Sequence, residues 1–155
     1  MSGNSRLTLA VHTLTWMARR MANYGDQYDF STSREIAESV NTNPVTLREL
    51  LGMMEEQGLV TVQRGSNAGW KLARKPEEIT LLEVYQVVKP HTMFTLHHTP
   101  PNPKCPIGCG IGPALQGVYA NVQEAMEEEL ARTTIADVLR DTLASTAAIH
   151  ARQNE

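Results

Sequence analysis

Two helix-start signals lie close together in the first half of the chain, and they limit the folds open to it. Thr32 and Glu35 have the spacing of a capping box, in which the two side chains accept hydrogen bonds from backbone N–H groups at a helix start. Asn43-Pro44 then places a capping side chain before a proline at the first position of a second helix, which Gly58 is expected to end. Two short helices joined by a tight connection predict a helix-turn-helix.

The segments on either side complete a winged form of this motif. Apolar residues recur every three to four positions over residues 5–21, which predicts a first helix with one buried face. Residues 59–73 have strand composition around a Gly- and Asn-containing turn, so they predict a β-hairpin, the wing. Thr80 and Glu83 repeat the capping-box spacing at the start of a further helix. We therefore expect residues 1–90 to form a winged helix-turn-helix DNA-binding domain.

The second half of the chain has a different pattern. Residues 91–112 hold many of the prolines and both cysteines, and they predict an irregular loop that senses a signal. From Pro113 apolar residues recur for about five turns beside a glutamate-rich face, which predicts a long helix. The chain has little other apolar surface to cover it, so we expect a homodimer. With a last helix from Thr134, residues 113–155 form the dimerisation region of a mostly α-helical fold.

Composition excludes membrane proteins and secreted disulfide scaffolds. The 155 residues contain two cysteines and no apolar run near the roughly 20 residues that a membrane helix needs. We expect a cytoplasmic protein, without a membrane partner, whose cysteines are thiols at rest. The formal net charge is −3, but residues 1–75 carry nine Lys and Arg against seven Asp and Glu. This slight positive excess is compatible with an N-terminal half that faces phosphates.

Several short segments together resemble one family of regulators. They are Glu35-Ile36-Ala37, Asn43-Pro44-Val45, Leu50-Leu51, Gly58-Leu59-Val60, Arg64-Gly65, Gly69-Trp70-Lys71-Leu72-Ala73 and Pro76-Glu77-Glu78-Ile79-Thr80-Leu81. In this combination the chain resembles the Rrf2 family of winged-helix repressors, which includes an iron–sulfur cluster regulator, a nitric-oxide-sensing repressor and a cysteine-metabolism repressor. The resemblance implies a homodimer that binds a palindromic operator in double-stranded DNA and receives its signal in the loop before the long helix.

The second helix of the helix-turn-helix is expected to read DNA bases. Its face opposite the apolar residues, near the end that enters a major groove, carries Val45, Thr46, Arg48 and Glu49. The alternative is that Arg48 and Glu49 form an ordinary solvated face, and the family resemblance favours DNA contact. Phosphate contacts are expected from the start of the first helix of the motif and from the N-terminal helix, through Ser33, Arg34 and Arg6.

The wing is expected to contact DNA as well. Its candidate residues are Arg64, Ser66, Asn67 and Lys71. Arg64 has the side chain that enters a minor groove, while the small residues let the backbone approach the duplex. Lys71 has the alternative role of an edge-strand charge that discourages strand pairing. Trp70 is expected to anchor the wing in the core rather than to stack on a base.

The loop cysteines are the candidate sensor. Cluster-binding relatives use three cysteines, whereas this chain has Cys105 and Cys109, so an iron–sulfur cluster would need a histidine or a ligand from the second protomer. Cys105, in Cys-Pro-Ile-Gly, resembles the sensor cysteine of members that respond to oxidants or electrophiles. His97, His98, Lys104 or the nearby N-terminus of the long helix could lower the pKa of its thiol. Cys105 could also be a small buried hydrophobic residue, or pair with Cys109 in a disulfide.

Three alternative functions stay open: a metal-binding protein, an enzyme and an interaction adaptor. A Zn²⁺ or Cu⁺ site could use Cys105, Cys109 and one of His91, His97 or His98, although the spacing is not standard. An enzyme would need more than a thiol–histidine pair, and the glycine run at residues 108–112 lacks the spacing and preceding strand of a nucleotide loop. An interaction adaptor could keep the fold without binding DNA. We expect instead a repressor with no resident cofactor, in which chemistry at Cys105 changes the spacing of two DNA-reading helices.

Overall fold

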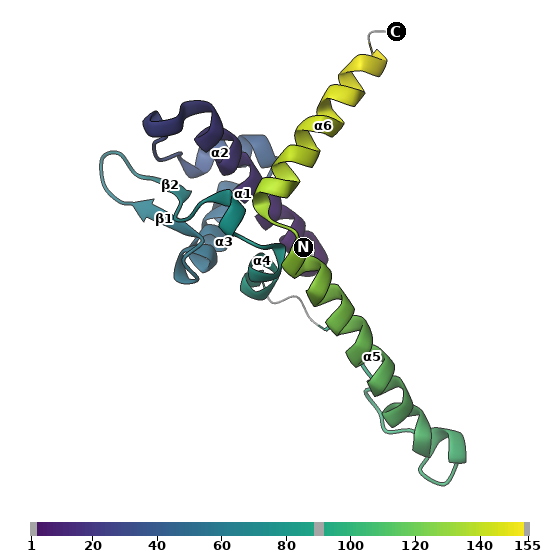
Figure 1. The fold of residues 1–155 in the computed structure, drawn as a ribbon. Helices are drawn as coiled ribbons and strands as arrows, with labels where there is room; N and C mark the ends of the chain where they lie inside the picture. The colour runs from purple at the N-terminus through teal and green to yellow at the C-terminus, as the bar shows by residue number, and fades with distance from the viewer. Residues whose placement is uncertain (1–2, 89–91, 154–155) are drawn as a thin grey trace.

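The computed structural model describes residues 3–88 and 92–153, and in this range the chain is mostly helical. The elements are α1 (Gly3–Tyr24), a 3₁₀ turn (Gly25–Gln27), α2 (Ser33–Val40), α3 (Pro44–Glu56), β1 (Val60–Gln63), β2 (Gly69–Leu72), a second 3₁₀ turn (Pro76–Glu78), α4 (Leu81–Val88), α5 (Pro106–Arg132) and α6 (Ile135–Gln153). Figure 1 shows α1–α4 and the hairpin as a body, from which α5 and α6 diverge as two arms. The predicted winged helix-turn-helix is confirmed.

The helix-turn-helix forms through the predicted caps. The Glu35 N–H donates to Thr32 Oγ1 at 3.2 Å, and the Thr32 N–H donates to Glu35 Oε2 at 2.7 Å. Asn43 Oδ1 accepts from the Val45 N–H at 2.8 Å, with Pro44 at the first helical position. Between the helices Asn41 has φ of 51°, a left-handed conformation that asparagine tolerates better than most residues. These local bonds set the short connection between α2 and α3.

The wing is tied to the segment that precedes α2. Strands β1 and β2 pair antiparallel, with Thr61 opposite Lys71. Ser31 extends this pairing, because its N–H donates to the Trp70 carbonyl at 2.9 Å and the Trp70 N–H donates to the Ser31 carbonyl at 2.8 Å. Trp70 also packs on the core, as expected. The base of the wing is therefore fixed to the helix-turn-helix in two ways, by the backbone hydrogen bonds of Ser31 and by the packing of Trp70 on the core.

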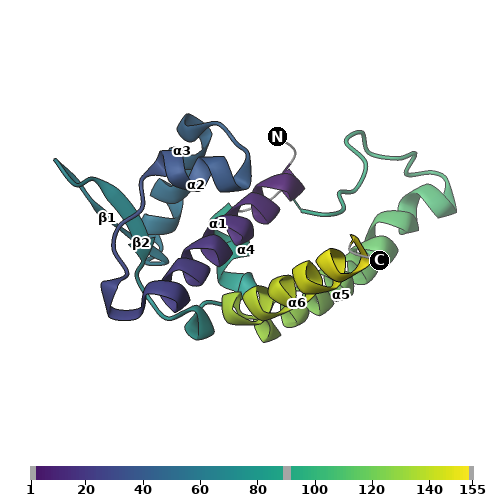
Figure 2. The ribbon, with the colours of Figure 1, turned by 90° about the horizontal axis from the view of Figure 1, so that it is seen from above.

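Helix α1 is the centre of the body. Seen from above, it lies between the α2–α3 pair with the hairpin on one side and α6 on the other (Figure 2). Its Leu14 and Met17 are fully buried in one cluster with Ile36 of α2, Leu50 of α3 and Val84 of α4. Burial of side chains of this size stabilises a fold by about 1.5–3 kcal/mol each. Helices α1–α4 of the body therefore share one core.

The starts of α4 and α6 are hydrogen-bonded to each other. The Leu81 N–H donates to the Thr133 carbonyl and the Ile135 N–H donates to the Ile79 carbonyl, both at 2.9 Å. Each helix also opens with a capping box, Thr80–Glu83 as predicted and Thr134–Asp137. Ile135 is fully buried in the core of the body. The C-terminal arm is thus anchored in the DNA-binding half.

The start of the long helix differs from the prediction. It begins at Pro106, so residues 106–112 of the predicted loop are helical and Pro113 lies inside α5. Cys105 holds the cap position before Pro106, and a proline at the first position can start a helix, although the Cys105 side chain makes no cap hydrogen bond of the kind that Asn43 makes. Of the glycines that suggested a loop, Gly108 allows close packing instead, since a Cβ there would lie 2.5 Å from the Asn102 carbonyl oxygen. The missing N–H of Pro113 is tolerated because this stretch is exposed to water.

Candidate DNA interface and thiol segment

The predicted base-reading residues lie on the outer face of α3. Val45 is 63% exposed, Arg48 and Glu49 are exposed, and Thr46 is half-buried. Leu47 and the other apolar residues of α3 face the core beneath them. One exposed apolar side chain beside a cation and a carboxylate offers groups for a thymine methyl, a guanine edge and a cytosine amino group. The side chains of Val45, Arg48 and Glu49 are therefore accessible on the outer face of α3, and the DNA contacts of all four candidates stay predictions.

The start of α2 carries mixed charge. Ser33 and Arg34 lie there as predicted, but the capping carboxylate of Glu35 occupies the same helix end. The hydrogen bond from the Thr32 N–H and the favourable charge of Arg20 hold the pKa of Glu35 below its ordinary value, so this carboxylate is ionised at neutral pH. A phosphate at this end would therefore meet the Arg34 charge with Glu35 close by.

The two wing cations have different partners. Arg64 lies 3.5 Å from Glu55 at the end of α3, and the Arg64 side chain is 78% exposed. Lys71 Nζ lies 4.5 Å from the centroid of the Phe30 ring, which is a cation–π distance. The turn residues Ser66 and Asn67 are exposed. The sequence analysis did not identify Glu55 as the partner of Arg64 or Phe30 as the partner of Lys71, because each partner comes from another element of the fold.

Two arginines, Arg6 and Arg20, lie towards opposite ends of α1. Arg6 contacts Met53 of α3, with Nη2 3.4 Å from the sulfur. Arg20, which the sequence reasoning did not select, stacks over Trp16 and Tyr24 at 5.1 Å from each ring centroid. The i, i+4 spacing of these three side chains was the signal for this stack. Arg20 adds a cation near α2 to the candidate phosphate contacts.

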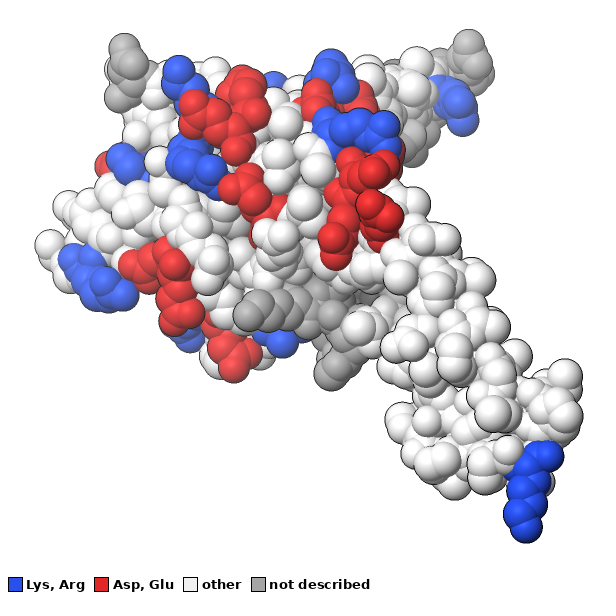
Figure 3. Space-filling model, turned by 60° about the horizontal axis from the view of Figure 1, so that its bottom comes forward, with Lys and Arg blue, Asp and Glu red and all other residues white. Residues whose placement is uncertain are grey.

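Charge is unevenly distributed over the molecule. In Figure 3 basic and acidic side chains interleave on the body, while the far part of the α5 arm is almost uncharged. Residues 92–123 contain one charged side chain, Lys104. A surface of this composition is typical of a region that becomes covered in an assembly.

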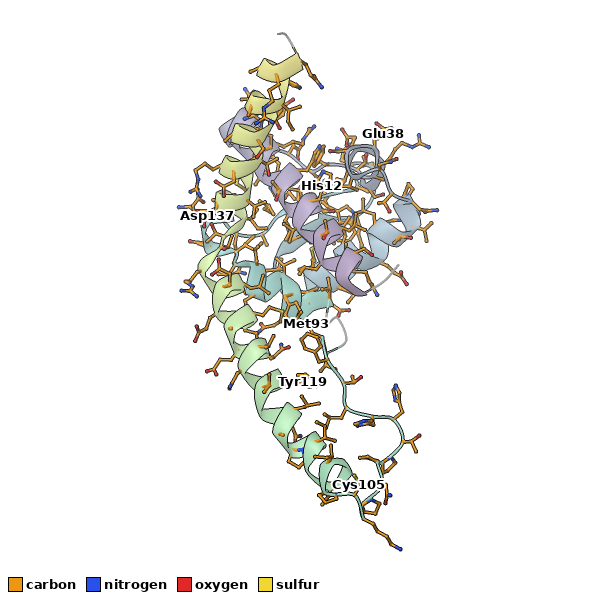
Figure 4. All side chains as sticks on the ribbon, turned by 90° about the vertical axis from the view of Figure 1, so that its right-hand side faces the viewer. His12, Glu38, Met93, Cys105, Tyr119 and Asp137 are labelled. Atoms are coloured by element: carbon orange, nitrogen blue, oxygen red, sulfur yellow. The ribbon has the colours of Figure 1, made fainter. Side chains whose placement is uncertain are left out.

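The candidate sensor lies at the far end of the α5 arm. Figure 4 shows Cys105 there, well away from His12 of α1 and Asp137 at the start of α6. Cys105 is half-buried, which argues against a buried core role, and Cys109 is exposed one turn later. The nearby N–H groups of Gly108 and Ile107 favour the thiolate and hold the pKa of Cys105 below its ordinary value. His97 and His98 are exposed in the loop.

Comparison with protein families identifies this architecture. Residues 4–141 match the Rrf2 family, which is described as an iron-dependent transcriptional regulator. The chain belongs to the Rrf2 family. This chain is also 41% identical over 138 residues to YwnA of Bacillus subtilis (strain 168), which is named as an HTH-type transcriptional regulator. That match covers 88% of this chain and 96% of YwnA.

Solved structures share the fold of this Rrf2 protein. The crystal structure of a protein described as DNA-binding has a TM-score of 0.65 at 36% identity, and the match covers 86% of this chain and 98% of that protein. A transcriptional regulator from Lactobacillus plantarum has a TM-score of 0.72 at 24% identity, over 97% and 98%. IscR of T. potens has a TM-score of 0.64 at 22% identity, over 88% and 85%. The Rrf2 protein is thus an HTH-type DNA-binding transcriptional regulator. No helix within the described residues could span a membrane.

Among the residues that the structure describes, none come together as an iron or cluster site within one chain. Over residues 3–88 and 92–153, no three His, Cys, Asp or Glu side chains come close enough to hold a metal ion. An iron–sulfur cluster is usually held by thiolates, and Cys105 and Cys109 supply two. The alternative ligand His91 lies outside the described residues.

Proposed function

We propose that this protein is a homodimeric repressor whose operator binding is controlled by oxidation or electrophilic modification of Cys105. The observation that carries the DNA-binding part is the outer face of α3, with exposed Val45, Arg48 and Glu49 beside a wing that presents Arg64. A recognition helix and a wing on one side of a body match the docking of helix-turn-helix proteins in a major groove. The family membership supports the same conclusion.

The two arms support the homodimer. Within Pro106–Arg132, all of which the structure describes, no residue is buried, and Val118 of α5 is 54% exposed. The outer part of α6 carries no charge over residues 142–149 and exposes Leu143 and Ile149. Apolar helical arms of this length lose exposed surface when they pack on a second copy, and a two-fold arrangement is the commonest way to do so.

The position of Cys105 supports its coupling to DNA binding. Cys105 is the residue before α5, so a larger or charged group on its sulfur would change the first turn of the arm that we assign to the dimer interface. Two recognition helices must be about 34–36 Å apart to meet successive turns of one DNA face. A change in how the arms pack would misalign one of them.

DNA binding is tested by selecting duplexes from a random-sequence library with the purified protein. We expect enrichment of an inverted repeat, and weaker binding to the enriched duplex for Arg48→Ala, because this substitution removes a candidate base contact. Each lost base contact is expected to cost about 1–3 kcal/mol. Enrichment of no sequence, together with undetectable binding at low salt, would favour an interaction adaptor instead.

The thiol switch is tested on the enriched duplex with mild oxidant under anaerobic preparation. We expect the oxidant to release the unmodified protein and Cys109→Ser, but not Cys105→Ser, because the backbone N–H groups near Cys105 favour its reactive thiolate. Release of Cys105→Ser to the same extent would contradict this part of the proposal. A brown protein that contains iron and sulfide would assign the sensor to an iron–sulfur cluster, held by Cys105 and Cys109 with a histidine or a ligand from the second protomer.

A further inference from the structure

The wing arginine is held by a carboxylate of the recognition helix. Arg64 Nη2 lies 3.5 Å from Glu55 Oε2, and the two side chains are 78% and 33% exposed. Glu55 lies in the last turn of α3, and Arg64 directly follows β1, so the contact joins the two elements that would meet DNA in different grooves. An exposed ion pair with one contact at this distance is weak, so Arg64 can exchange its partner readily.

We propose that Glu55 is the resting partner of Arg64 and that Arg64 leaves it for the negative charge of DNA when the protein binds. This inference rests on the proposed function and names a residue that sets its affinity. The guanidinium of Arg64 makes stronger paired hydrogen bonds with a phosphate than the single contact that it makes with Glu55. Breaking the pair opposes binding, so Glu55 lowers the affinity of the wing for DNA.

The second wing cation shows why the exchange is specific to Arg64. Lys71 rests on the Phe30 ring, which attracts the ammonium group without neutralising it. Among the described residues Lys71 has no ion pair. Its full charge is therefore available to DNA without loss of a carboxylate partner.

A double-mutant cycle separates this role from simple charge repulsion. The variants are Glu55→Gln and, as a matched control, Glu56→Gln, each made with Arg64 and with Arg64→Met. Glu56 is the next residue of α3, is exposed, and has no ion pair within the described part of the chain. The ligand is a random-sequence DNA duplex of about 30 base pairs, long enough for both halves of a dimer. Binding is followed by fluorescence anisotropy at fixed salt.

We expect Glu55→Gln to tighten binding about threefold more than Glu56→Gln does, which is within the range for an exposed ion pair. With Arg64→Met the two glutamine variants should bind equally, since the partner of Glu55 is gone. Arg64→Met alone should weaken binding and lower the slope of log affinity against log salt by about 1. Unchanged thermal unfolding shows that none of these effects is structural.

The outcomes distinguish this inference from the function on which it rests. Equal effects of the two glutamine variants in the presence of Arg64 would show that Glu55 is only a nearby charge. Weaker binding by Glu55→Gln would show that Glu55 holds Arg64 in its DNA-binding position, which also overturns the proposal. Failure of the unmodified protein to bind the duplex at about 50 mM salt would overturn the proposed function itself.

Discussion

Gly69 lies where there is no room for a side chain. A Cβ at this position would lie 2.8 Å from Phe30 Cβ and 3.0 Å from the Ser31 carbonyl oxygen, because the segment before α2 runs antiparallel beside β2 there. The same pairing brings Phe30 beneath Lys71 and joins Ser31 to Trp70. One glycine thus permits the contact between the wing and the helix-turn-helix.

We predict that Gly69→Ala lowers the free energy of unfolding by about 1–3 kcal/mol, the usual cost of overpacking. Gly52→Ala is the matched control, since its Cβ would meet nothing within 4 Å inside α3. That control should raise stability by about 0.5–1 kcal/mol, because alanine favours a helix interior. Urea denaturation measures both free energies of unfolding. An unchanged value for Gly69→Ala would show that the segment before α2 moves easily to make room for the added Cβ.

The elements with local start signals were predictable from the sequence, and those set by distant contacts were not. Thr32, Asn43 and Thr80 each start a helix through bonds within four residues, so the pattern alone located α2, α3 and α4. Cysteine is not a typical capping residue, and the glycines after Cys105 suggested a loop, so the start of α5 was missed. The partners of Arg64 and Lys71 come from other elements, which no local pattern reveals.

The capping box of α4 gives a pH dependence. Burial would raise the pKa of Glu83, but hydrogen bonds from the Thr80 backbone and Arg74 outweigh it, so the pKa lies below its ordinary value. The stability that Glu83 contributes is therefore present above its unfolded pKa of about 4.3 and is lost as pH falls through the folded value. This contribution is small, about 1 kcal/mol or less, because more than a third of the carboxylate side chain is exposed.

We predict that Glu83→Gln is less stable than the unmodified protein at neutral pH and loses less stability on acidification. Urea midpoints measured between about pH 6 and 3 give the two slopes, which follow the linkage of protons to folding. Glu77→Gln, an exposed neighbour in the 3₁₀ turn before α4, is the control and should follow the unmodified protein. Parallel curves for Glu83→Gln and the unmodified protein would contradict the prediction.

At the scale of the whole molecule, the two arms expose apolar surface that the body does not cover. Val118 and Val122 are exposed on α5, and Phe94 of the preceding loop stacks on Tyr119 with the ring centroids 5.1 Å apart. Val122 borders the hollow that Phe94 and Tyr119 line, whereas Val118 is not among its lining residues. Val118 is therefore the natural contact for a second copy.

We predict that Val118→Glu converts the proposed dimer to a monomer, since a buried unpaired carboxylate opposes association strongly. Sedimentation equilibrium measures the change, and circular dichroism should still show a folded helical protein because Val118 is not in the core. Gln116→Glu adds the same charge to a residue beside Phe94 and Tyr119 and should remain dimeric. A monomeric unmodified protein would contradict the proposed homodimer.

The hydrogen bonds between Ile79, Leu81, Thr133 and Ile135 join the two ends of a long stretch of chain that contains α4, the loop and α5. Within that stretch α4 packs in the core, whereas no residue of α5 is buried. The loop and α5 therefore leave the body after α4 and return to backbone that is already paired at its base. A change in the length of this excursion would leave the paired backbone, and the core beneath it, in place.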